Sequence, residues 1–185
     1  MIGVPLGLLY ANAGEWLIHK HLLHGRGRNR ESYWSFHWHD HHRNVRTNAH
    51  IDPHYERSLL GWHAQSKEAL GLVLTGAMHL PLLPVAPFFT GAVLYSTWNY
   101  YKVHKRSHQD PGWAREHLTW HYDHHMGPNQ DANWCVTRPW FDKLMGTYEP
   151  YAGTEREAKD NQRRQRLARR AKEQAAAARP EAMGA

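Results

Sequence analysis

The residues best suited to chemistry in this chain are its histidines, which occupy 17 of the 185 positions. Neutral imidazole is a good ligand for zinc, iron, copper and nickel, so an excess of this size favours metal binding. Because a structural zinc needs only four ligands, ten clustered imidazoles predict two metal ions with about five histidines each. Ten histidines form four clusters with repeated spacings: His19 and His24; His37, His41 and His42; His104 and His108; His121, His124 and His125.

The spacings indicate how the ligands would divide if each cluster lies on an α-helix. At about 100° per residue, His104 and His108 lie about 40° apart and share one face. Residues five apart, such as His19 and His24, diverge by about 140°. Adjacent residues diverge by about 100°. We therefore expect pairs that are adjacent or five apart to divide between the two metals.

Three segments must position these clusters. Residues 1–14 carry no charge, and they begin a predicted helix over about 4–24 that is apolar first and histidine-bearing last. From Ala69 to Tyr101 the chain has no Asp, Glu, Lys or Arg, and three prolines interrupt this stretch near its middle. The pieces 69–80 and 85–101 predict an apolar helical hairpin. Beyond Gly153 the chain predicts a solvated, basic helix with a disordered end.

The hairpin leaves two interpretations open. Each piece is short for a bilayer core, which needs roughly 20 apolar residues, so the hairpin is expected to dip into the membrane or barely cross it. The alternative is a buried hairpin of a soluble protein, which a mean hydropathy of −0.78 favours. Lys and Arg are abundant in residues 26–67 and in the tail. This distribution places the histidine clusters and the tail on the cytoplasmic side.

Composition excludes several classes of protein. The net charge is +6, but residues 155–185 alone hold nine Lys/Arg against five Asp/Glu, so no basic patch with interleaved aromatics is expected and we predict no nucleic-acid partner. Cys135 is the only cysteine, which excludes an internal disulfide and fits a reducing compartment. The first residues lack the basic region of a standard secretory signal.

The order HxxxxH, HxxxHH, HxxxH, HxxHH resembles the fatty acid hydroxylase superfamily, also called the sterol desaturase family. The segment NQDANWCVTRPWFDKLMGTYEPY resembles that family's ending, and the resemblance covers about residues 11–151. It implies an all-α, membrane-associated helical bundle in which residues 1–152 form the di-iron domain, with a cytosolic His-rich di-metal cap, and residues 153–185 form the tail. It implies two Fe ions, O2 as co-substrate, and a fatty acyl, sterol or carotenoid type of substrate that is hydroxylated or desaturated. Electrons would come from an external donor of the ferredoxin, rubredoxin or cytochrome b5 type.

Carried over residue by residue, the resemblance makes all ten clustered histidines ligands. In HWHDHH, His39 is an alternative to His37 as the first ligand of its cluster, and the family's spacing favours His37. Zinc in recombinant protein would be compatible with this ligand set, because zinc competes with iron for imidazole sites. No side chain is expected to act as a nucleophile. The oligomeric state is not predicted.

Further residues are expected to surround the metals. Acids within a few residues of a ligand, together with an Asn of the family-like ending, are candidates to hold the second ring nitrogen of a ligand: Glu15, Asp40, Asp123, Asp131 and Asn133. Aromatic residues are candidates to line a substrate channel: Trp98, Tyr101, Trp120 and Trp134. Two other functions stay open, a zinc-dependent hydrolase or lyase on the same scaffold and a non-catalytic lipid-binding relative.

Overall fold

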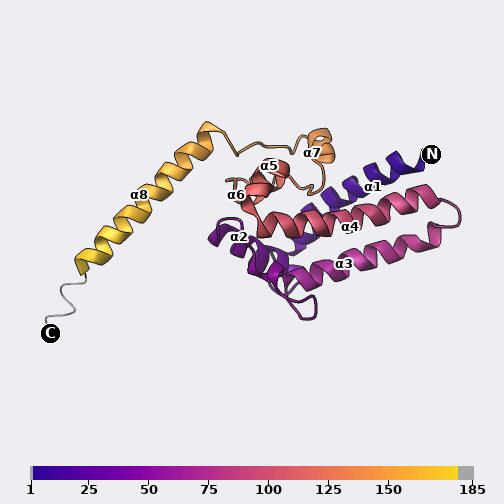
Figure 1. The fold of residues 1–185 in the computed structure, drawn as a ribbon, viewed down its shortest axis with the longest axis horizontal. Coiled ribbons are helices and arrows are strands. Elements are labelled where there is room, and N and C mark those ends of the chain that lie inside the picture. The colour runs from indigo at the N-terminus through magenta and orange to yellow at the C-terminus, as the bar shows by residue number, and fades with distance from the viewer. Residues whose placement is uncertain (1, 179–185) are drawn as a thin grey trace. The chain divides into compact units, whose positions relative to one another are not determined.

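The computed structural model describes residues 2–178 and is helical throughout, with no β-strand in that range (Figure 1). The predicted all-α fold is confirmed. The chain divides into two compact units, residues 1–150 and 151–185. The histidine clusters all belong to the first unit.

Three long helices form the body of the first unit: α1 (Gly3–Ile18), α3 (Ala64–His79) and α4 (Pro87–Gln109). They lie side by side, with α4 packed against both α1 and α3 (Figure 1). Glycine permits the close approach of α1 to α4, because a Cβ atom on Gly7 would lie 2.7 Å from the Cβ of Ala92. Small residues at a helix crossing let two backbones come together in this way.

The predicted helical hairpin is present as α3 and α4, joined by a short 3-10 turn, η4 (Leu80–Leu82). Pro87 occupies the start of α4, where its missing N–H has no helical partner to lose. Both helices extend further than predicted, because α3 begins at Ala64 and α4 continues to Gln109. The last turns of α4 therefore carry His104 and His108, so the hairpin itself positions part of the histidine set.

Short elements gather at the end of the long helices that is opposite the hairpin turn (Figure 1). They are α2 (Arg43–Thr47), η3 (Pro53–Glu56), α5 (Pro111–His117) and α6 (Thr119–Met126), while α7 (Trp140–Met145) packs on α1. The Asp110 side chain begins α5 by accepting a hydrogen bond from the N–H of Trp113 at 2.9 Å. We call residues 19–63 and 104–150 the cap.

Two segments of the cap are π-helical, η1 (His19–Arg26) and η2 (Phe36–His42). The predicted helix over 4–24 is thus observed as α1 followed directly by η1, and it changes its winding at His19. At the end of η1 the N–H of Gly27 donates to the carbonyl of Leu22 at 3.0 Å, a bond between residues five apart. Such wide turns are rare and occur frequently at functional sites.

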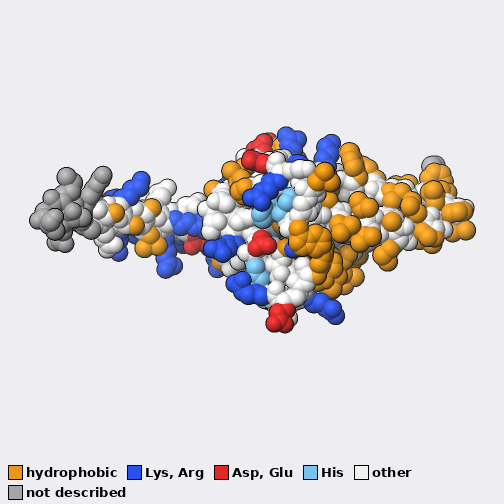
Figure 2. All heavy atoms as spheres, turned by 90° about the horizontal axis from the view of Figure 1, so that it is seen from below, with side chains coloured by type: hydrophobic (Ala, Val, Ile, Leu, Met, Phe, Trp, Pro, Cys, Tyr) orange, Lys and Arg blue, Asp and Glu red, His pale blue; other side chains and the backbone are white. Residues whose placement is uncertain are grey.

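The exterior of the long helices is apolar. Large hydrophobic side chains are exposed along α1, α3, α4 and the hairpin turn, among them Leu6, Leu9, Val73, Met78, Val85 and Phe88. Figure 2 shows them covering the half of the first unit built from these helices, while charged side chains gather around the cap. Within residues 2–178 no helix combines the length and the hydropathy that crossing a bilayer requires.

The second unit consists mainly of α8 (Glu155–Ala178). Residues 161–175 are all exposed, which agrees with the predicted solvated helix. Within this unit the Tyr151 hydroxyl donates to the Asp160 carboxylate at 3.1 Å. The disordered end predicted for the tail falls on residues 179–185, which lie outside the described residues.

Candidate metal centre

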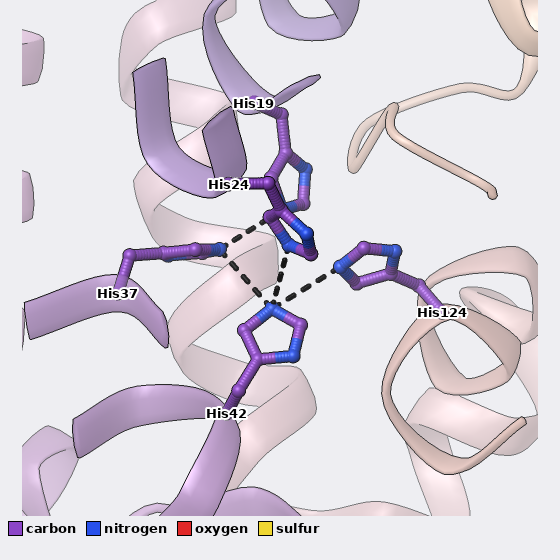
Figure 3. A group of neighbouring side chains, drawn as sticks. All are labelled: His19, His24, His37, His42 and His124. Atoms are coloured by element: carbon purple, nitrogen blue, oxygen red, sulfur yellow. Dashed lines mark hydrogen bonds between the residues drawn. The ribbon is translucent and has the colours of Figure 1, made fainter. Parts of the chain in front are cut away.

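All ten clustered histidines are buried, and none is more than 2% exposed. They form two neighbouring groups. Site A, drawn in Figure 3, consists of His19, His24, His37, His42 and His124. Site B consists of His41, His104, His108 and His125, with His121 joined to it. In site A and in the first four residues of site B, one ring nitrogen per residue lies within 4.8 Å of the others.

The rings of site A point their Nε2 atoms toward one another (Figure 3). Nε2 of His42 lies 3.0 Å from that of His24, 3.2 Å from that of His37 and 3.2 Å from that of His124. Nε2 of His19 completes the group at 3.0 Å from that of His37. The five residues come from α1–η1, from η2 and from α6, so the site exists only when these three parts of the cap are assembled.

Site B is built on the end of α4. Nε2 of His108 lies 3.2 Å from that of His104 and 3.0 Å from that of His121. The rings of His41 and His125 enter the same group, and their Nε2 atoms have no hydrogen-bond partner among the described residues. The two sites adjoin.

Hydrogen bonds fix the tautomer of three rings in site A. Nδ1 of His19 donates to the carbonyl of Trp134 at 2.5 Å, and Nδ1 of His124 donates to the carbonyl of Ala132 at 2.6 Å. Nδ1 of His42 donates to Oε1 of Gln130 at 2.7 Å. Because these oxygens only accept, each Nδ1 carries the proton, and each Nε2 of the neutral ring keeps its lone pair.

Site B has the same arrangement with different partners. Nδ1 of His41 donates to the Asp52 carboxylate at 2.8 Å, and Nδ1 of His104 lies 2.7 Å from the Glu68 carboxylate. The same Glu68 oxygen accepts from the Tyr55 hydroxyl at 2.7 Å. Nδ1 of His108 donates to the carbonyl of His50 at 3.1 Å. The inner Nε2 atoms of these three rings are therefore lone-pair donors as well.

Two pairs of facing Nε2 atoms have no proton to share between them. In site A the Nε2 atoms of His42 and His124 are 3.2 Å apart, and each of these rings has its proton on Nδ1. In site B the same holds for His104 and His108. Buried lone pairs that converge without a donor are unfavourable, and a metal cation satisfies them. The residues of both sites therefore fit a metal ion, with the outer acceptors orienting the rings.

Burial lowers the pKa of several of these imidazoles, which favours their neutral form. It lowers the pKa of His124 to about 4. It also lowers the pKa values of His37 and His108 well below the ordinary range, with neighbouring histidines adding to the effect. Burial by itself would raise the pKa of Asp52, but the hydrogen bonds that it accepts, first from His41, outweigh this and lower it to about 2. Asp52 is thus an anion that accepts a hydrogen bond from the His41 ring.

The π-helical winding corrects one prediction from the spacings. His19 and His24 were expected to divide between the metals, but both belong to site A, as do His37 and His42. In a π-helix residues five apart lie above one another, so both pairs share a face. The expected division holds for adjacent residues, because His42 lies in site A and His41 in site B.

The α6 cluster divides in the same manner. His124 belongs to site A, while His125 and His121 belong to site B. The predicted shared face of His104 and His108 is observed in site B. The HxxxxH spacing, which occurs twice in the chain, was the sequence signal for π-helical winding.

The structure separates His37 from His39. The ring of His37 is buried in site A, whereas Nε2 of His39 lies 3.0 Å from the carbonyl oxygen of Arg28, outside both sites. His50, which lies outside the four clusters in the sequence, is fully buried and has a φ of 79°. Its ring packs 4.8 Å from that of His108 but belongs to neither group.

The acids predicted to hold the ligands are largely the wrong ones. Among them Asp131 approaches a ligand, with its carboxylate 3.7 Å from Nδ1 of His24, and it also binds Arg28 at 2.7 Å. Glu15 instead accepts hydrogen bonds from the backbone N–H groups of Val136 and Thr137 at 3.0 and 2.9 Å. Its role is to hold this loop against α1.

The other predicted candidates have different positions. Asn133 exchanges two hydrogen bonds with the backbone of Glu149, at 2.7 and 2.9 Å, and has a left-handed φ of 56°. Asp40 is exposed, and Asp123 is buried within α6. The residues that do orient ligands, Asp52, Glu68 and Gln130, were not predicted, because they are distant in sequence from the rings they contact. Glu68 alone carried a signal, as the last acid before the uncharged stretch.

A cavity of about 350 Å³ opens beside the metal centre, between α1, α3 and α4. His19 and His37 of site A form part of its wall, together with Glu15, Glu68 and Tyr100. Most of the remaining wall is apolar, including Leu22, Leu72, Leu74, Met78 and Val93. The volume is at the lower end of the range for small-molecule sites.

The four aromatic residues predicted for a substrate channel do not line this cavity. Trp134 is buried against the His24 ring, with centroids 4.7 Å apart, and Nε1 of Trp120 donates to the carbonyl of Val136 at 2.8 Å. Tyr101 contacts Gln65 through its hydroxyl, and Trp98 is exposed. The rings of Trp134 and Trp120 thus serve packing and anchoring.

The chain matches no protein-family model, no curated protein and no solved structure. What the fold and the site define is an all-helical protein with two adjoining groups of buried histidines that are arranged to bind metal.

Proposed function

We propose that this protein is an O2-dependent di-iron oxygenase that hydroxylates or desaturates a lipid-like substrate at a membrane. The observation that carries the proposal is the pair of adjoining all-histidine sites, whose Nε2 lone pairs converge beside an apolar cavity. The histidine spacings and the ending that resemble the fatty acid hydroxylase superfamily point to the same function.

Each part of the cap has a defined task in this proposal. A bound iron pair would supply O2 activation and electron transfer, which no side chain of this protein provides. The Nε2 atoms of sites A and B would hold the ions, while acceptors such as Asp52 and Gln130 keep the rings in the required tautomer. Burial of the cap excludes water from the reacting centre.

The apolar helices supply the substrate's environment. The cavity runs between α1, α3 and α4 and reaches two ligands of site A, His19 and His37. The outer faces of the same helices expose large hydrophobic side chains. A patch of this kind is typical of a membrane-contacting surface. We propose that the helices dip into one leaflet, with the cap at the cytoplasmic surface, where an external electron donor reaches it.

The proposal is tested with purified protein loaded anaerobically with Fe(II) and then exposed to O2 and a chemical reductant in the presence of lipid extract. We expect O2 consumption that depends on iron, and oxidised lipids that contain one added oxygen atom or one added double bond. Lipid profiles of cells with and without the gene identify the substrate. Hydrolysis by the zinc-loaded protein without O2 uptake would establish the zinc-dependent hydrolase instead.

A further inference from the structure

One side chain in the cavity wall differs from all the others. Lys67, in the first turn of α3, is the only lysine or arginine among the residues that line the cavity. Most of the wall beyond the metal end is apolar. A half-buried ammonium group at an apolar cavity calls for an anion.

The surroundings of Lys67 hold the ammonium group without neutralising it. Three aromatic rings face Nζ: the centroid of Trp62 lies 5.2 Å away, that of Phe36 5.4 Å and that of Tyr33 5.9 Å. Within residues 2–178 no carboxylate lies within ion-pair distance of Nζ. Cation–π contacts position a lysine while leaving its charge available to a ligand.

Lys67 lies at the end of the cavity near the metal sites. Its neighbour Glu68 contacts Nδ1 of the site B ligand His104, and Phe36 directly precedes the site A ligand His37. Residues near the C-terminal end of α3, such as Met78, line the cavity about three turns away from Lys67. The cavity therefore has one end with a cation and metal ligands, and another end, around Met78, where Lys, Arg, Asp and Glu are absent from the lining residues.

We propose that Lys67 binds the carboxylate head group of a lipid-like substrate. The hydrocarbon chain then extends along α3 toward Met78, and the carbons nearest the head group lie closest to the metals. This inference rests on the proposed function for the reaction itself. The head-group selectivity is a property of the cavity and is measured without turnover.

The test uses the full-length protein loaded with zinc in a neutral detergent, and it measures binding of dodecanoate and dodecanol. Lys67→Met is compared with Lys102→Met, because Lys102 also lies over a tryptophan, 5.0 Å from the Trp98 centroid, but does not line the cavity. We expect Lys67→Met to bind dodecanoate at least about tenfold more weakly, the loss expected for a charge-assisted contact. Dodecanol binding should be unchanged, and Lys102→Met should match the unmodified protein for both ligands.

Three other outcomes would overturn the proposal. Equal loss of both ligands would show that Lys67 only shapes the cavity, and loss of neither would show that it does not contact the ligand. A Lys67→Met variant that loses binding only to vesicles containing anionic lipid would make Lys67 a membrane anchor. If the head-group preference is present while the iron-loaded protein consumes no O2, the proposed function fails and the Lys67 site survives.

Discussion

Sites A and B use the same ligand type but differ in what holds the ligands. The outer acceptors of site A are neutral: two backbone carbonyls and the amide oxygen of Gln130. Asp131 brings a carboxylate near this site, at 3.7 Å from His24, but it is paired with Arg28. Site B instead has two carboxylates in direct contact with its rings, Asp52 at 2.8 Å and Glu68 at 2.7 Å.

This difference teaches how one all-histidine centre can hold two inequivalent ions. A carboxylate that accepts from Nδ1 raises the basicity of the ring and partly balances the charge of a bound cation. A carbonyl or amide oxygen also orients the ring, but it raises the ring's basicity less and balances less of the cation's charge. We therefore expect site B to bind its metal more tightly than site A, although both present imidazole nitrogen alone.

The largest expected effect comes from removing one ligand from each site. His124→Ala should empty site A and His41→Ala should empty site B, so that each variant binds one metal where the unmodified protein binds two. Both should abolish turnover. Metal analysis after anaerobic loading measures the change, and a variant that retains both ions would show that the removed ring is not a ligand.

His39→Ala is the matched control for these variants. His39 lies between the ligands His37 and His41 in sequence, but its ring lies outside both sites. It should keep two metals and most of the activity. Loss of metal in His39→Ala together with retention in His37→Ala would reverse the assignment of this cluster.

Exchanging the outer acceptors sharpens the comparison directly. Asp52→Asn should weaken metal binding at site B by about 10–100-fold, the usual effect of losing such a partner. Gln130→Glu should strengthen metal binding at site A, since it gives His42 a carboxylate in place of an amide. Competition with a chelator measures both affinities. If each substitution changes the metal affinity of both sites equally, then the neutral and anionic acceptors do not cause a difference in affinity between site A and site B.

Acid should destabilise the metal-free protein through its neutral histidines. Burial lowers the pKa of His124 to about 4, so below pH 6.5 the unfolded chain binds a proton that the folded protein does not. The free energy of unfolding then falls by about 1.4 kcal/mol per pH unit for such a group, between its unfolded and folded pKa values. Asp52, with a pKa of about 2, lowers the free energy of unfolding further only at still lower pH. Urea midpoints that rise as the pH falls from 6.5 to 4.5 would contradict this sign.

The smallest effect on metal binding is expected at His50. Its ring is fully buried against the site B ligand His108 but is not part of either group. His50→Ala should keep both metals and lower the free energy of unfolding by about 1–3 kcal/mol, because it removes a buried ring. A metal count of one in His50→Ala would enlarge site B to include it.

Particular residues show what the sequence could and could not predict. The division of His41 from His42 follows from their adjacency on any helix, and the hairpin follows from prolines within an uncharged stretch. The joining of His19 with His24 was not predictable from α-helical angles, because the winding changes to π at His19.

Contacts between residues that are distant in sequence could not be predicted from local sequence patterns. Asp52 reaches His41 and Glu68 reaches His104 only once the cap has folded around α4. The four residues predicted for a channel lie outside the cavity for a related reason. Trp134 and Trp120 use their rings for packing and for a backbone hydrogen bond, and aromatic composition cannot distinguish that use from lining a cavity.

The most direct test of a two-metal centre is an anaerobic titration of the purified, metal-free protein with Fe(II). The structure predicts that close to two equivalents bind, that the first fills site B, and that Asp52→Asn weakens this first step while leaving the total at two. Saturation at one equivalent would contradict the account, because sites A and B could not then both be metal sites.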